Sequence, residues 1–79
     1  MTIRLRAFAG AREVLGGEST LELPVGATCG SAWELLRERH EALRSLPLKG
    51  LAVNREYVSF EHELADGDEL AVIPPVSGG

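Results

Sequence analysis

The group best suited to chemistry in this chain is the C-terminal carboxylate of Gly79, which ends the tail Pro74-Pro75-Val76-Ser77-Gly78-Gly79. The two prolines cannot donate ladder hydrogen bonds, and they stiffen the exit from the preceding apolar segment. Glycine allows the closest approach of another backbone. Fully extended, residues 74–79 would project roughly 20 Å, at about 3.3 Å per residue. The tail therefore suits insertion into a narrow channel of another protein.

A free carboxylate is a poor electrophile, because it must gain a leaving group before a nucleophile can displace one. Adenylation with ATP would supply that leaving group, and a terminal glycine places the least bulk beside the attacked carbonyl. The tail therefore indicates activation by a partner enzyme rather than catalysis by this chain. The alternative is an inert terminus, since many chain ends are frayed and without function.

The side chains offer little other chemistry. The sequence contains no Ser-His-Asp set and no His/Cys cluster with metal-ligand spacing, so we expect no metal site. His62 lies between two glutamates and is expected on the solvated surface. Cys29 and Trp33 fall on the apolar side of a helical pattern and are expected in the core. Gly16-Gly17 predicts a turn, because the pair lacks the Lys-Ser/Thr of a phosphate-binding loop.

Length and charge limit the function classes further. The chain has 79 residues, enough for one small domain, and its net charge of −4 with no basic cluster disfavours nucleic-acid binding. The acidic residues gather late in the sequence, and we interpret them as a solvated turn region, with a docking surface for a basic partner as the alternative. They are Glu61, Glu63, Asp66, Asp68 and Glu69.

A cytoplasmic location is the default expectation. A single cysteine, Cys29, cannot form a disulfide within the chain, which fits a reducing compartment. Arg4 and Arg6 interrupt the apolar start that a signal peptide needs. No apolar run approaches the roughly 20 residues of a membrane span, so we expect no association with a membrane.

Hydrophobic periodicity predicts the elements that carry the tail. Residues 2–8 and 19–23 alternate as two strands of a hairpin, with residues 11–15 forming about one helical turn between them. Thr28 is the expected N-cap of one long helix, whose apolar face runs from Cys29 through His40 to Leu43. Short strands are expected at 51–53 and 56–58, around a turn at Asn54-Arg55. A turn at Asp66-Gly67-Asp68 then precedes a last strand at 69–73.

This order of elements predicts an α+β fold, a mixed sheet of four to five strands with one main helix packed on one face. We place the folded domain at residues 1–73 and a flexible tail at 74–79.

Several segments resemble a known family. They are Phe8-Ala9, Ala11-Arg12-Glu13, Ala52-Val53-Asn54, Val58-Ser59, Leu64 with Asp66-Gly67-Asp68-Glu69, and the tail from Pro74 to Gly79. On these residues the sequence resembles the small subunit of molybdopterin synthase, the MoaD family of ubiquitin-like sulfur carriers. The resemblance covers nearly the whole chain, although residues 29–49 share only the helical pattern.

The resemblance implies a β-grasp, ubiquitin-like fold and a sequence of reactions at Gly79. An E1-like enzyme of the MoeB type would adenylate the carboxylate with MgATP, and a sulfur donor would convert the acyl-adenylate into a thiocarboxylate. The carrier would then dock on a MoaE-type large subunit, in a heterotetramer of two small and two large subunits. There the sulfur would pass to cyclic pyranopterin monophosphate to form the molybdopterin dithiolene. The chain alone would be non-catalytic and would bind no cofactor, since ATP and magnesium belong to the activating enzyme.

The resemblance also implies roles for individual residues. Gly79 would carry the sulfur, and Gly78, Ser77, Val76 and Pro75 would form the inserted tail. Three apolar residues would form the partner interface, with core packing as the alternative for the first and last of them: Phe8, Tyr57 and Ile73. Arg12 also matches a family position, but we assign it no role.

Three other functions stay open on the sequence. The first is a sulfur carrier for thiazole formation in thiamine synthesis, a family that also ends in Gly-Gly. The second is a ubiquitin-like modifier whose Gly79 is joined to lysines of target proteins. The third is a plain interaction domain with an inert tail.

Overall fold

The computed structural model describes residues 1–75, and residues 76–79 are not described. The predictions for Val76, Ser77, Gly78 and Gly79 therefore lie outside the described residues. Residues 1–75 form five strands, two α-helices and one 3₁₀-helix in the order β1 (Thr2–Ala7), α1 (Ala9–Leu15), β2 (Glu18–Glu22), α2 (Cys29–Arg39), η1 (Glu41–Ser45), β3 (Gly50–Val53), β4 (Glu56–Val58) and β5 (Glu69–Ile73).

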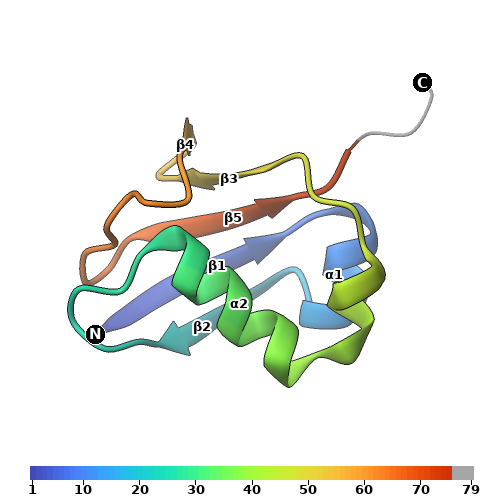
Figure 1. Cartoon of the computed structure of the whole chain (residues 1–79), viewed down its shortest axis with the longest axis horizontal. Helices are drawn as coiled ribbons and strands as arrows, with labels where there is room; N and C mark the ends of the chain where they lie inside the picture. The colour runs from blue at the N-terminus through green and yellow to red at the C-terminus, as the bar shows by residue number, and fades with distance from the viewer. Residues whose placement is uncertain (76–79) are drawn as a thin grey trace.

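The strands form one mixed sheet in the order β2-β1-β5-β3-β4. The central pair β1 and β5 is parallel, with Arg4 opposite Glu69 and Ala7 opposite Val72, and the other pairs are antiparallel. Helix α2 crosses one face of this sheet, as Figure 1 shows. The expected α+β, β-grasp arrangement is confirmed, and the strands lie within one residue of their predicted bounds.

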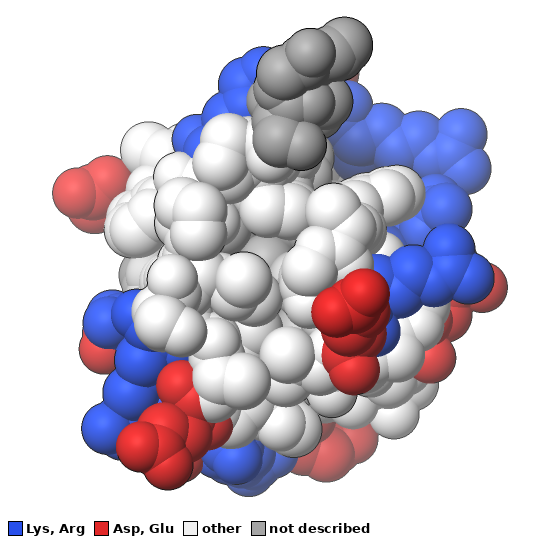
Figure 2. Space-filling view, turned by 90° about the vertical axis from the view of Figure 1, so that its right-hand side faces the viewer, with Lys and Arg blue, Asp and Glu red and all other residues white. Residues whose placement is uncertain are grey.

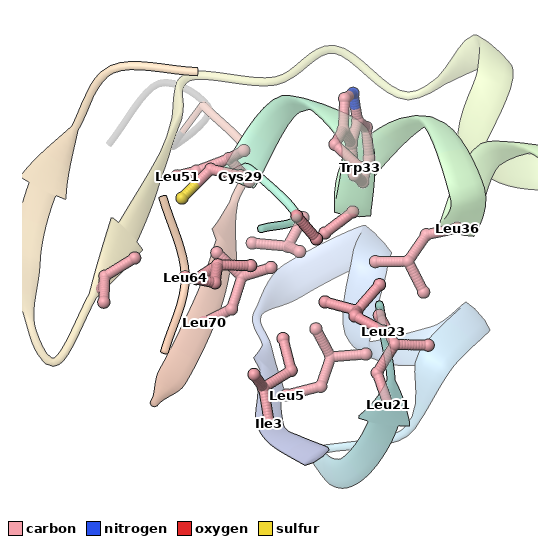
Figure 3. Packing of buried hydrophobic residues seen from close by; sticks show 14 of the residues in the cluster. Ile3, Leu5, Leu21, Leu23, Cys29, Trp33, Leu36, Leu51, Leu64 and Leu70 are labelled. Carbon is pink, nitrogen blue, oxygen red and sulfur yellow. The ribbon is translucent and has the colours of Figure 1, made fainter. Parts of the chain in front are cut away.

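The hydrophobic core lies between the sheet and α2. Alternate residues of the strands point toward the helix, so that Ile3, Leu5, Leu51 and Leu70 are almost completely buried. These side chains form one cluster with Trp33 and Leu36 from α2 and with residues from β2 and the loops, and Figure 3 labels the main members. Cys29 and Trp33 belong to this core, as predicted.

Helix α2 begins where predicted but ends early. The Thr28 hydroxyl accepts a hydrogen bond from the Ser31 backbone N–H at 3.1 Å, and the Ser31 hydroxyl accepts one from the Thr28 N–H at 2.9 Å. The predicted extension to Leu43 was wrong, because His40 is extended and caps the helix after Arg39. A longer helix would carry Leu43 about 10 Å beyond Leu36, at about 1.5 Å per residue. The 3₁₀-helix η1 instead returns Leu43 to the core, where it is buried.

Two turns fix the far end of the sheet. Asn54 and Arg55 have φ values of 50° and 72° and connect β3 to β4, the geometry of a two-residue hairpin loop. The Asp68 carboxylate accepts hydrogen bonds from the Ala65 N–H at 2.8 Å and from the Asn54 amide at 3.0 Å. The turn predicted around Gly67 is therefore confirmed and tied to the β3–β4 loop.

One acidic residue was interpreted wrongly. Glu61, Glu63 and Asp66 are exposed, as expected for a solvated turn region. Glu69, however, is only 9% exposed, because it is the first residue of the central strand β5 and lies on the sheet.

Candidate functional site

The face of the sheet opposite α2 carries the candidate docking site. Strand alternation turns Arg4, Arg6 and the following Phe8 to this outer face, because Ile3, Leu5 and Ala7 point into the core. On β5 the same alternation places Glu69, Ala71 and Ile73 outward. In Figure 1 no helix lies on this side of the strands among the described residues.

A shallow depression of about 450 Å³ lies on the outer face, and we call it the outer groove. Its floor is low because two alanines, Ala52 and Ala71, lie directly opposite each other on β3 and β5. Larger side chains surround this floor and make the depression concave. The lining residues are Arg6, Phe8, Ala52, Arg55, Tyr57, Glu69, Ala71 and Ile73.

All three residues of the predicted partner interface line the outer groove. Phe8 follows β1, caps the start of α1 and is 42% exposed. Tyr57 is 61% exposed, and its ring lies over Gly50, where an added Cβ would come within 3.2 Å of the ring carbons. Ile73 is half-buried opposite Gly50 at the end of β5. The structure therefore brings together Phe8, Tyr57 and Ile73 from three separate strands or strand ends.

An ion pair between Arg6 and Glu69 lies on one side of the outer groove. The Arg6 guanidinium lies 3.9 Å from the Glu69 carboxylate and 5.4 Å from the centre of the Phe8 ring. A guanidinium over an aromatic face is favourable because the ring carries negative charge density there. Arg6 thus links the buried Glu69 to Phe8 and limits the positions that the Phe8 ring can take.

The chain leaves the sheet beside the outer groove. Strand β5 ends at Ile73, whose carbonyl accepts a hydrogen bond from the Lys49 N–H at 2.9 Å. Pro74 is buried and Pro75 is exposed. Figure 2 views this end of the molecule, and it shows a broad area of uncharged side chains with charges of both signs around its edge. A partner that receives the C-terminal segment would meet this uncharged surface.

Comparison with known proteins identifies the family. The model of the ThiS family matches residues 5–79. The chain belongs to the ThiS family. It is 42% identical to the molybdopterin synthase sulfur carrier subunit of Chlamydomonas reinhardtii, over the full length of both chains. A protein of Pyrococcus furiosus assigned as molybdopterin converting factor subunit 1 has a solved structure with a TM-score of 0.86, at 34% identity over 96% of this chain and 99% of that one. The SAMP1 structure from Haloferax volcanii matches the whole of both chains, with a TM-score of 0.84 and 31% identity.

Other candidate groups in this ThiS-family chain lie apart from the outer groove. Cys29 is fully buried, and burial, with a smaller contribution from Asp68, raises the pKa of its thiol. A buried thiol with a raised pKa is a poor nucleophile. His62 is exposed, as predicted, and His40 is half-buried at the end of α2. Within residues 1–75 no group of three His, Cys, Asp or Glu side chains could hold a metal ion, and no helix of this part is long and apolar enough to cross a membrane.

Arg12 lies in a second depression that adjoins the outer groove. This depression is also lined by Arg6, Phe8 and Gly17. The Arg12 Nε lies 3.4 Å from the position that a Cβ on Gly17 would occupy, so the guanidinium lies against the backbone at Gly17. The structure therefore places Arg12 beside the predicted interface.

Sequence reasoning missed five residues of the groove. Ala52 and Ala71 form its floor, Arg6, Arg55 and Glu69 are its charged residues, and none was assigned to the partner interface. The signal available was alternation, which places Arg6 on the same face as Phe8 and Ala71 on the same face as Ile73. Alternation does not give the pairing between strands, so these five residues could not be assigned to one site.

Proposed function

We propose that this chain is the sulfur carrier subunit of molybdopterin synthase and that its Gly79 carries the sulfur as a thiocarboxylate. The match over the full length of a molybdopterin synthase sulfur carrier subunit is the observation that supports this function most strongly. The outer groove supports it independently, since it places three apolar residues beside the point where the chain leaves β5.

The proposed reaction uses the terminal carboxylate in three steps. An E1-like enzyme transfers AMP from MgATP to the Gly79 carboxylate and releases pyrophosphate. A sulfur donor then displaces AMP, and the C-terminus of the chain becomes a thiocarboxylate. In the synthase this sulfur passes to cyclic pyranopterin monophosphate, and water restores the carboxylate. One dithiolene needs two sulfur atoms, so two carriers that each hold a thiocarboxylate act for each product.

Both the large subunit and the activating enzyme would recognise the folded domain. We propose that Phe8, Tyr57 and Ile73 bind an apolar surface of a MoaE-type large subunit, and of a MoeB-type activating enzyme in turn. Exposed apolar side chains around a shallow groove are typical of interaction sites. Residues 75–79 would then enter the partner's active site, in an assembly of two small and two large subunits.

Intact-mass measurement tests the carrier chemistry. The protein is incubated with ATP, an E1-like enzyme and a sulfur donor, and the expected change is the replacement of one oxygen by one sulfur at the C-terminus. A chain truncated after Gly78 is the matched control and should not convert. An unchanged mass for the full chain would contradict the proposal. Addition of the large subunit and cyclic pyranopterin monophosphate should then yield molybdopterin, whereas a thiamine-pathway carrier would give none.

A protein modifier is the second candidate function. The similarity to Haloferax volcanii SAMP1, a small archaeal modifier protein, favours it. The two functions share an activated Gly79, so both are possible for one chain. Lysine-linked conjugates in extracts of cells that express the tagged protein, absent for the truncated chain, would support the modifier.

A further inference from the structure

Two arginines lie at the end of the outer groove that is away from the tail. A small depression there is lined by Arg4, Asn54, Arg55 and Glu69, and Arg55 and Glu69 also line the outer groove. The two depressions therefore adjoin each other at these two shared residues. Arg4 lies on β1 directly opposite Glu69 on β5.

The two arginines at this end of the groove have no ion-pair partner among residues 1–75. Glu69 is paired with Arg6, and no carboxylate of residues 1–75 lies within 4.0 Å of the Arg4 or Arg55 guanidinium. The other acids at this end bond to groups other than the two arginines: Asp66 accepts from the Thr2 N–H, and Asp68 accepts from the Asn54 amide and the Ala65 N–H. The Glu22 carboxylate is already bonded to the Thr2 hydroxyl. The Arg4 and Arg55 guanidinium groups thus line the depression without an ion-pair partner among residues 1–75.

The backbone at Arg55 is strained. Its φ of 72° lies in the left-handed region, and the second position of such a hairpin loop favours glycine. The first position suits Asn54, whose side chain bonds to Asp68 and to the Glu69 N–H. An arginine at the second position is unfavourable for the turn itself, and the fold presents its side chain at the groove. A strained residue beside a binding surface suggests a functional use of its side chain.

We propose that Arg4 and Arg55 bind an acidic segment of the protein that docks on the outer groove. The partner would place an apolar element between Phe8, Tyr57 and Ile73 and one or more carboxylates against the two arginines. Guanidinium groups bind carboxylates with two parallel hydrogen bonds, which would also orient the partner along the groove. The inference rests on the proposed function, since it assumes that a partner docks on this face. It adds a charged contact at the end farthest from the tail.

Association kinetics with the purified large subunit test this inference. Arg4→Gln and Arg55→Gln each remove one positive charge from the groove, and Arg39→Gln removes one from α2, on the opposite side of the sheet. At an ionic strength of about 0.01 M the Debye length is about 30 Å, so charge steering is strong there. We expect the double groove variant to associate about tenfold more slowly, and its rate to depend less on salt. Arg39→Gln should behave as the unmodified protein.

A second variant separates charge from folding. Arg55→Gly suits the turn conformation, so it should fold at least as stably while losing the contact, and we expect association as slow as for Arg55→Gln. Equal rates and equal salt dependence for all variants would overturn the charged contact while leaving docking on the groove intact. Equal slowing by Arg39→Gln would also overturn it, because the effect would then be one of net charge. If the unmodified protein does not bind the large subunit at all, the proposed function fails, and this inference fails with it.

Discussion

Phe8→Ala should weaken binding of the large subunit without unfolding the domain. The Phe8 side chain is 42% exposed and lies outside the main core cluster. An aromatic side chain buries about 200 Å² in full, so roughly 80 Å² of Phe8 remains for a partner to cover. At about 25 cal/mol per Å² this area corresponds to about 2 kcal/mol of binding free energy.

The expected loss is large enough to measure. A change of about 2 kcal/mol corresponds to roughly a 30-fold increase in Kd. Isothermal titration calorimetry with the purified large subunit gives Kd, and thermal unfolding checks that the variant is folded. Val25→Ala is the matched control, because Val25, at 89%, is the most exposed large apolar residue among residues 1–75 and does not line the outer groove. It should leave Kd unchanged.

The contribution of Arg6 to binding can be measured in the same way. Arg6 lies over the Phe8 ring and contacts Glu69, so Arg6→Gln should weaken binding by a smaller factor than Phe8→Ala. In the Phe8→Ala background the same change should matter less, because the ring that Arg6 holds is gone. A Kd for Phe8→Ala within about threefold of the unmodified value, which is below about 0.7 kcal/mol, would refute docking on the outer groove.

Three further predictions concern stability. Thr28→Ala should lower the free energy of unfolding by about 1 kcal/mol in urea titrations, because the Ser31 N–H loses its acceptor; a change near zero would show that the cap contributes little. Arg55→Gly should raise this free energy by roughly 0.5 kcal/mol, since relief of about 1 to 2 kcal/mol of strain exceeds the added entropy of the unfolded chain; a lower stability would contradict the strain at that turn. Burial raises the pKa of Cys29 above its ordinary value of 9.0, so the folded state holds the proton more tightly, and the stability present below pH 9.0 should be lost as pH rises through the folded pKa. Unfolding titrations at pH values below and above 9.0 should show this loss of stability. The Cys29→Ala variant should not show the part of the loss that comes from the thiol.

Local patterns in the sequence were sufficient to predict most of the fold. Alternation in β1 and β5 assigned both faces of each strand, because successive side chains of a strand point to opposite sides wherever the strand lies. Thr28 marked the start of α2, because its cap involves only residues within one turn. The Asp66-Gly67-Asp68 turn was equally local. The sequence also predicts the Gly79 carboxylate as the reactive group, and this prediction lies outside the described residues.

The tertiary structure decided everything that depends on pairing between strands. Phe8, Tyr57 and Ile73 lie up to 65 positions apart in the sequence numbering, and only the order β1-β5-β3-β4 brings them around two opposed alanines. The burial of Glu69 and the end of α2 at Arg39 also required the fold, since each depends on which distant segment packs against the residue. Side-chain alternation repeats every two residues and so carries no information on the register of a neighbouring strand. Register follows from nonlocal hydrogen bonds and core packing, and these gather Phe8, Tyr57 and Ile73 around the outer groove, beside the point where the chain leaves β5.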